Sequence, residues 1–271
     1  MQVREKIWHL PLLDQVRHIL PLAAAAVMLV LCMVMEICAI PLTEEIRDRI
    51  YSILGNTSFY VCILLCTVYG RKYGLDWLRS LIFSFCSFQI VFSWASVLNV
   101  KLDIWMFGEG TIASFRSAML LPLLCLVLSR FCKLDTWNLS DYLTPYFFLH
   151  HGIVTFACWV KGCCAGKTWP WGFHNPLTGL TVFPVQLLII ILSFAVAYWG
   201  LHYSKKMAYR ANGVVFANSL ILYGFFRYLI ELFTDDFRVF WTLSWLSVCS
   251  LAMIVMGVLV RYLVGKTAKT P

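Results

Sequence analysis

The feature that most constrains this chain is a series of eight predominantly apolar runs, each close to the length of a membrane-spanning helix. A spanning helix needs about 20 such residues. The runs cover residues 19–42, 51–69, 78–100, 112–131, 142–160, 183–201, 214–233 and 240–264. They leave no segment of domain size outside the membrane. We therefore predict an all-α, polytopic integral membrane protein with about eight transmembrane helices in a single transmembrane domain, 1–271.

Composition excludes a water-soluble enzyme of this length. Charged residues make up 13% of the chain and apolar residues 61%, whereas a soluble domain carries about 25% charge. The net charge is +8, but there is no compact basic patch with interleaved aromatic residues, so we expect no nucleic-acid partner. Membrane proteins instead use Lys and Arg to fix their orientation.

The distribution of Lys and Arg predicts that both termini lie in the cytoplasm. With the N-terminus inside, the cytoplasmic segments hold 14 of these residues and the opposite segments hold 6, which fits the positive-inside rule. The first run, 19–42, is too long for the apolar core of a cleaved signal and lacks a small-residue cleavage site. We interpret it as a retained anchor helix.

Eleven cysteines are present, and most lie inside apolar runs, where a thiol behaves as a small hydrophobic group. Only Cys158, Cys163 and Cys164 cluster near a predicted loop. Their spacing matches neither a paired CxxC zinc site nor a regular disulfide framework. The sequence therefore predicts no metal and no cofactor.

Two of the 22 basic residues, Arg116 and Arg227, fall inside predicted spans. An arginine at the centre of a membrane helix costs roughly 2.5 to 3.5 kcal/mol, so we expect each to face a partner or a cavity. At 1.5 Å per residue they lie about 6 Å and 9 Å below the outer ends of their helices. Glu231 follows Arg227 by four residues, which predicts an ion pair on one helix face.

Other polar residues converge at a similar depth. Gln186 lies one turn into the sixth run, and His150 and His151 lie near the middle of the fifth, so these spans can enclose one chamber that opens outward. Two guanidiniums against one carboxylate predict a net positive pocket, suited to the headgroup of an anionic phospholipid. Alternatively, Arg227 and Glu231 form a packing pair, Arg116 snorkels, and the histidines only hydrogen-bond neighbouring helices.

The longest predicted outer loop, 161–182, contains four Gly, two Pro and two Trp residues and is therefore expected to have a defined shape. A long loop above a polar chamber is often a lid or an entry for a second substrate, and otherwise a plain connector. Signatures of other chemistry are absent from the sequence, among them HExxH, the P-loop and GxSxG. The function is therefore expected within the membrane cavity.

Four segments carry a family resemblance. Asp141-Tyr-Leu-Thr-Pro, Cys158-Trp-Val-Lys-Gly-Cys-Cys-Ala-Gly, Phe183-Pro-Val-Gln and Tyr223-Gly-Phe-Phe-Arg-Tyr-Leu-Ile-Glu occur in this order. In order and spacing they resemble the prolipoprotein diacylglyceryl transferase family. The likeness is clearest over about 112–233, the family-like core extends over about 51–264, and the anchor helix 19–42 is additional.

The resemblance implies an enzyme of the bacterial plasma membrane that transfers diacylglycerol from phosphatidylglycerol to the lipobox cysteine thiol of a preprolipoprotein, without a cofactor. It implies that Arg227 binds the phosphate and that Glu231 supports Arg227. Candidate catalytic residues are then Arg227, Glu231, Arg116, His150 and His151. Candidate substrate-binding residues are Tyr223, Gln186, Thr155, Gly162, Cys163, Cys164 and Gly166.

The sequence also departs from the family pattern. Thr155 stands where the family usually has an arginine, and Arg116 aligns with a family histidine. In one interpretation, Arg116 replaces the lost arginine across the cavity and His150 or His151 serves as the base for the thiol. In the other, the lipid pocket persists without lipoprotein transfer, in a phospholipid-binding membrane protein or a transferase for a different acceptor.

Overall fold

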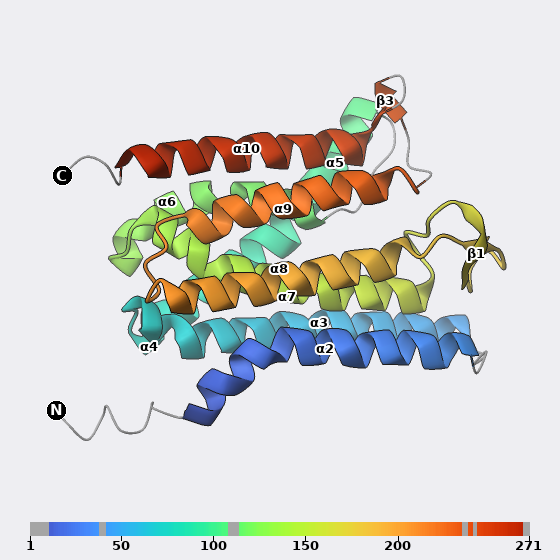
Figure 1. Ribbon diagram of the computed structural model, residues 1–271, viewed down its shortest axis with the longest axis horizontal. Coiled ribbons are helices and arrows are strands. Elements are labelled where there is room, and N and C mark those ends of the chain that lie inside the picture. The colour runs from blue at the N-terminus through green and yellow to red at the C-terminus, as the bar shows by residue number, and fades with distance from the viewer. Residues whose placement is uncertain (1–10, 38–41, 108–113, 235–237, 241–242, 268–271) are drawn as a thin grey trace.

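The computed structural model describes residues 11–37, 42–107, 114–234, 238–240 and 243–267. It is a bundle of long helices that lie roughly alongside one another, with two short β-hairpins (Figure 1). The α-helices are α2 (Pro11–Ile37), α3 (Glu44–Tyr69), α4 (Trp77–Phe88), α5 (Ala95–Phe107), α6 (Leu121–Cys132), α7 (Thr136–Lys161), α8 (Val185–Lys206), α9 (Val214–Glu231) and α10 (Trp245–Thr267). Shorter helical segments are η1 (Gly70–Tyr73), η2 (Gln89–Trp94) and η3 (Ser114–Leu120), and the strands are β1 (Thr168–His174), β2 (Thr181–Val182), β3 (Arg238–Phe240) and β4 (Leu243–Ser244).

Each predicted apolar run contains helix in its described part, so the polytopic helical membrane architecture is confirmed. The third run is the most irregular, because the π-helical segment η2 separates α4 from α5. By length and apolarity, five helices among the described residues qualify as membrane spans, or six if one sharply bent pair counts as a single span. The bent pair consists of the helical residues 116–132 and helix α7, and the chain bends by 116° between them.

The prediction of an all-α fold needs a correction at the outer loop. Within 161–182 the chain forms the antiparallel β1–β2 hairpin, in which Phe173 and His174 pair with Val182 and Thr181. A second hairpin, β3–β4, precedes α10. In both hairpins the two strands pair their own backbone N–H and C=O groups, so these groups are satisfied outside the helices, which carry most of the apolar residues.

Helix α7 forms the centre of the bundle. The Asp135 side chain accepts hydrogen bonds from the backbone N–H groups of Trp137 and Asn138, which starts the helix. Gly162 ends it with a φ of +85°, a left-handed conformation that glycine adopts without strain. No residue of α7 is exposed, and the helix packs against α3, α6, α8 and α9.

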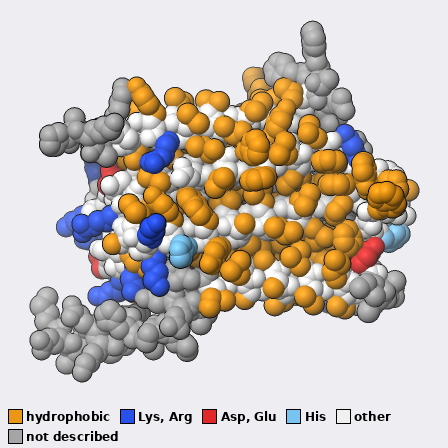
Figure 2. All heavy atoms as spheres, in the orientation of Figure 1, with side chains coloured by type: hydrophobic (Ala, Val, Ile, Leu, Met, Phe, Trp, Pro, Cys, Tyr) orange, Lys and Arg blue, Asp and Glu red, His pale blue; other side chains and the backbone are white. Residues whose placement is uncertain are grey.

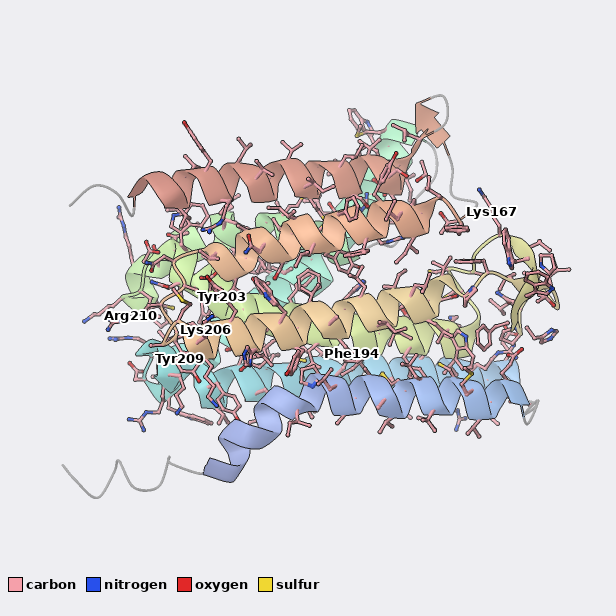
Figure 3. All side chains as sticks on the ribbon, viewed as in Figure 1. Lys167, Phe194, Tyr203, Lys206, Tyr209 and Arg210 are labelled. Atoms are coloured by element: carbon pink, nitrogen blue, oxygen red, sulfur yellow. The ribbon has the colours of Figure 1, made fainter. Side chains whose placement is uncertain are left out.

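The two ends of the bundle differ in charge. The start of α2 and the end of α10 lie at one end of the bundle, which we call the terminal end (Figure 1). The β1–β2 hairpin extends from the opposite end, which we call the hairpin end. Lys and Arg side chains gather at the terminal end, and hydrophobic side chains cover most of the length between the ends (Figure 2). Lys206 and Arg210 lie at the terminal end and Lys167 at the hairpin end (Figure 3).

Candidate functional site

The C-terminal half of α9 carries the central charged pair of the candidate site. Tyr223, Arg227 and Glu231 are spaced by four residues, so they share one face of the helix. All three are buried, with Arg227 6% exposed and Glu231 3% exposed. The Arg227 guanidinium and the Glu231 carboxylate form the ion pair that their spacing predicts.

Glu231 is held in place from two further directions. The Thr234 hydroxyl donates to its Oε1 at 2.6 Å, and the Ser244 hydroxyl, at the end of β4 just before α10, donates to the same oxygen at 3.3 Å. A carboxylate fixed by several hydrogen bonds restricts the arginine paired with it. The position of Arg227 is thus defined by α9, by the chain after it and by the segment before α10.

His151 of α7 approaches the same group. Its Nε2 lies 2.7 Å from the Tyr223 hydroxyl, and the ring is close enough to Arg227 to interact with it electrostatically. Thr155, one turn further along α7, donates its hydroxyl to the His151 carbonyl at 2.8 Å. The candidate residues Arg227, Glu231, Tyr223 and His151 therefore lie together, and Thr155 joins them through the α7 backbone.

His150 lies on a different side of α7. Its Nδ1 is 2.8 Å from the Ser58 hydroxyl on α3, and its ring packs edge-on against Phe59 and Phe88. His150 thus contacts α3 whereas His151 contacts Tyr223, because adjacent helix residues point about 100° apart.

Arg116, in η3, is buried as expected for a functional arginine, but it has a carboxylate partner that sequence reasoning missed. Its Nη1 and Nη2 donate to Oδ1 and Oδ2 of Asp103 at 2.8 and 2.7 Å. The Trp245 indole also donates to Asp103 Oδ1, at 2.9 Å. Both side chains of the ion pair are almost fully buried.

This pairing corrects the predicted charge of the pocket. In the described part of the chain the two guanidiniums meet two buried carboxylates, Glu231 and Asp103, so the net positive charge expected from the sequence is absent there. Cys249 on α10 interacts electrostatically with Arg116, Asp103 and Glu231, so both pairs border the same part of α10. The site consists of two neighbouring ion pairs.

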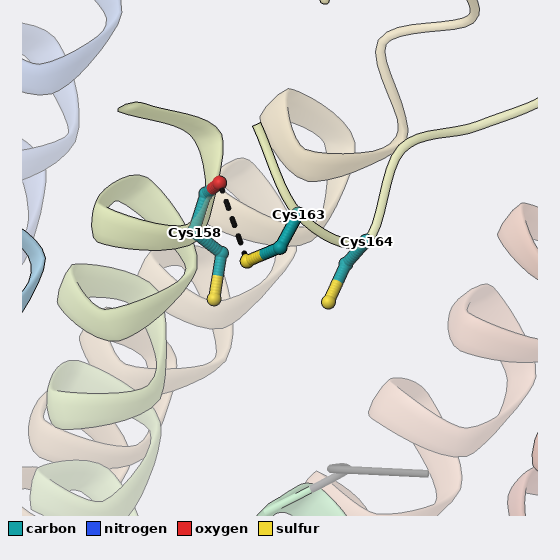
Figure 4. Close-up of side chains that lie close together, drawn as sticks. All are labelled: Cys158, Cys163 and Cys164. Atoms are coloured by element: carbon teal, nitrogen blue, oxygen red, sulfur yellow. Dashed lines mark hydrogen bonds between the residues drawn. The ribbon is translucent and has the colours of Figure 1, made fainter. Parts of the chain in front are cut away.

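The loop after α7 lies beside this region. Gln186, at the start of α8, donates a hydrogen bond from its side-chain amide to the Cys163 carbonyl at 2.8 Å. This bond holds the loop against α8. Cys164 is close enough to Arg227 to interact electrostatically with it. The Cys158, Cys163 and Cys164 sulfurs lie within 4.8 Å of one another (Figure 4). Hydrogen bonds from the other two thiols lower the pKa of the Cys163 thiol.

Gly166 lies where three segments meet. A Cβ at this position would be 2.6 Å from the Phe183 carbonyl and 3.0 Å from the Phe233 carbonyl. The next residue, Lys167, donates its backbone N–H to Phe233 and accepts one from Phe183. The backbone at 166–167 thus lies directly against the chain that follows α9 and the chain that precedes α8. Only glycine fits at position 166 without displacing these backbones.

Asp103 and Ser244 are the main polar residues that sequence reasoning missed. Asp103 follows the third apolar run by three residues and belongs to the same predicted outer side as Arg116, which is a usable but weak signal. Ser244 gives no signal, since a serine within an apolar run is common. Both take their roles from tertiary contacts.

The fold and the site together define a class of protein: a polytopic helical membrane protein with two buried ion pairs near one end of its bundle. Within this class, the chain belongs to the prolipoprotein diacylglyceryl transferase family, whose model matches residues 22–263. The match begins inside the first apolar run, 19–42, which we predicted from the sequence to be an anchor helix outside the family-like core.

Two relatives illustrate the similarity. The chain is 30% identical over 143 residues to the phosphatidylglycerol–prolipoprotein diacylglyceryl transferase of Clostridium tetani, an alignment that covers 48% of this chain and 56% of the relative. It is 25% identical over 236 residues to the protein of the same name from Synechocystis, covering 77% of this chain and 82% of the relative.

Proposed function

We propose that this protein transfers the diacylglyceryl group of phosphatidylglycerol to the lipobox cysteine thiol of a preprolipoprotein in the bacterial plasma membrane. The observation that carries the proposal is the buried Arg227–Glu231 pair, with His151 and Tyr223 beside Arg227. Family membership supplies the reaction, and this cluster supplies groups that suit it.

The reaction demands stabilisation of a growing negative charge. The acceptor sulfur forms a bond to the glyceryl carbon, the bond from that carbon to the phosphate oxygen breaks, and glycerol phosphate leaves. The phosphate changes from a singly charged diester to a monoester with a charge of about −1.5 to −2. An arginine that contacts it stabilises the transition state more than the bound lipid, which accelerates the reaction.

Arg227 suits this role because a guanidinium offers five N–H donors in one plane, a geometry that matches the oxygens of a phosphate. Glu231 holds the guanidinium in orientation. His151 is the group that we assign as acceptor of the thiol proton, with Tyr223 fixing its ring through the 2.7 Å contact. His150 faces α3 and receives no such role.

Arg116 receives a positioning role in this proposal. Its guanidinium is engaged by both Asp103 oxygens, and Asp103 also accepts from Trp245. The pair therefore connects η3, α5 and α10 at the border of the site. Gly162, Cys163, Cys164, Gly166, Gln186 and Thr155 are proposed to line or support the substrate path.

We also propose eight membrane crossings with both termini in the cytoplasm, in one transmembrane domain. The 116° bend between 116–132 and α7 turns the chain back on itself, which favours two crossings over one. Segments α4, η2 and α5 follow one another without a break and suit a single crossing. Lys and Arg gather at the terminal end, which favours that end as the cytoplasmic side (Figure 2).

A second candidate function is binding of anionic phospholipid without lipoprotein transfer, or transfer to another acceptor. It is favoured by Thr155, which stands where the family usually has an arginine and which, within the described part of the chain, donates its hydroxyl to its own helix. The engagement of Arg116 by Asp103 also leaves the phosphate mainly to Arg227.

A transfer assay on purified protein tests the proposal. Phosphatidylglycerol labelled in its acyl chains is supplied with a lipobox peptide, and the labelled peptide is measured. Arg227→Ala is expected to reduce transfer by about 100-fold or more. Arg261→Ala, on an exposed position of α10, is the matched control and should transfer normally. Undiminished transfer by folded Arg227→Ala would overturn the role of Arg227.

A further inference from the structure

Three cysteine thiols meet at the hairpin end of α7. Cys158 lies in the last turn of the helix, and Cys163 and Cys164 follow Gly162, the residue directly after the helix. Their sulfur atoms lie within 4.8 Å of one another, and the three side chains point to the same side (Figure 4). All three are free thiols, and Cys164 is exposed.

The backbone that presents these thiols is fixed from outside the cluster. The Asn175 side chain donates to the Gly162 carbonyl at 2.9 Å, and the Gln186 side chain donates to the Cys163 carbonyl at 2.8 Å. Cys164 has a φ of +58°, a conformation that costs a non-glycine residue energy. The surrounding structure therefore holds the cluster in a defined shape.

The geometry points to a zinc site formed by the thiolates of Cys158, Cys163 and Cys164, with the fourth coordination position left for a substrate. Zinc binds cysteine sulfur at about 2.3 Å, which places tetrahedral ligands about 3.8 Å apart. Small side-chain rotations bring three sulfurs within 4.8 Å to that spacing. Three protein ligands and one open position are typical of catalytic zinc sites, whereas structural sites have four protein ligands.

The open position gives the site a use, which rests on the proposed transferase function. Cys164 lies close enough to Arg227 for electrostatic interaction, so a ligand of the zinc would lie beside the phosphate-binding residue. A thiol that coordinates a metal is deprotonated, and the thiolate is the nucleophile. The acceptor cysteine would thus bind as thiolate, with its proton passing to His151.

The atoms of this step balance without an oxidant. The acceptor thiol loses its proton as it binds the zinc. Its sulfur then forms the bond to the glyceryl carbon while the carbon–oxygen bond to the phosphate breaks. Glycerol phosphate leaves with the electron pair, the proton held by His151 passes to it or to water, and the resulting thioether, a weaker ligand than a thiolate, dissociates. The charge on zinc and its three thiolates is unchanged over the cycle.

Metal content tests the site independently of activity. Protein purified in zinc-containing buffer is expected to hold about one zinc ion per chain. Cys163→Ser should lower zinc affinity by about tenfold or more, and Cys86→Ser, at a half-buried position on α4, should not. Cobalt in place of zinc should give thiolate-to-metal charge-transfer bands. Absence of these bands, or an intact mass lower by two hydrogens from a disulfide, would overturn the site.

Peptide addition tests the role of the fourth position. The cobalt spectrum should change with a lipobox peptide and stay unchanged with the same peptide carrying serine for cysteine; an identical response to both would overturn the role. Removing zinc should reduce transfer by about tenfold or more. Equal transfer by zinc-free protein would also overturn the role while leaving the transferase function intact. If neither form transfers although zinc and peptide bind, the transferase function fails and the metal site stands.

Discussion

At the scale of single residues, the contacts of His150 and His151 divide the α7 helix into two environments. His151 meets Tyr223 and Arg227 on one side, and His150 meets Ser58 and two phenylalanine rings on another. Under the proposed function a proton acceptor for the thiol has to lie near the phosphate that leaves, so of these two histidines we assign the role to His151, which lies beside Arg227.

Substitution of the two histidines therefore has different expected outcomes. His151→Gln should reduce the transfer rate by about 100-fold, within the range for loss of a general base, because an amide does not accept the proton. His150→Gln should lower the melting temperature but keep the rate per folded molecule. The check is transfer measured beside thermal unfolding in detergent. Equal rate losses in both variants, with equal stability, would contradict the assignment.

The sequence predicted the Arg227–Glu231 pair, because both partners lie on one helix and a four-residue spacing fixes their neighbourhood. It did not predict the partner of Arg116. Asp103 lies on another element, and contacts between elements depend on packing that a single sequence does not specify. The split between His150 and His151 was within reach, since it follows from helix geometry alone.

At the scale of elements, the Arg116–Asp103 pair joins η3 to α5, and Trp245 extends the connection to α10. Removing one member of a buried ion pair strands the other charge, which costs about 3–5 kcal/mol, whereas replacing both by apolar groups is far less costly. The pair is therefore expected to stabilise this corner of the bundle.

A comparison of a single and a paired substitution separates this role from phosphate binding. Arg116→Ala should lower the free energy of unfolding by about 3–5 kcal/mol, and Arg116→Met combined with Asp103→Leu should recover about half of the loss or more. Unfolding in detergent and binding of phosphatidylglycerol by the detergent-solubilised protein are measured for each variant. A stable Arg116→Ala protein that no longer binds the lipid would instead return Arg116 to the phosphate site.

The apolar runs and their lengths did not predict every element of the structure. Apolar runs located all the helices that carry the site, yet the π-helical segment η2 and the hairpin in 161–182 were not predicted. The Cys158, Cys163 and Cys164 sulfurs likewise meet only because Gly162 reverses the chain after α7. The sequence placed the three cysteines near one loop, but their spacing matched no metal-site pattern and did not predict that the three sulfurs meet.

At the scale of the whole molecule, orientation in the membrane decides which substrates reach the site. The Arg227 region lies toward the hairpin end, and the terminal end carries most of the Lys and Arg visible in Figure 2. If the terminal end is cytoplasmic, the site opens to the outer leaflet, where a secreted preprolipoprotein presents its lipobox.

Reporter fusions test this orientation. Alkaline phosphatase, which is active only outside the cytoplasm, should be inactive when fused after residue 267 and active when fused after residue 180. A green fluorescent protein fusion should show the reverse pattern. Phosphatase activity at residue 267 would contradict the topology and, with it, the access of the site to the outer leaflet.

The central claim is diacylglyceryl transfer, and product stoichiometry measures it most directly. The purified protein is placed in vesicles containing phosphatidylglycerol with a labelled headgroup glycerol and labelled acyl chains, and a lipobox peptide is added. We predict equal amounts of glycerol phosphate and of peptide carrying the diacylglyceryl thioether. Folded protein that binds phosphatidylglycerol but forms neither product would contradict the account and favour the lipid-binding alternative.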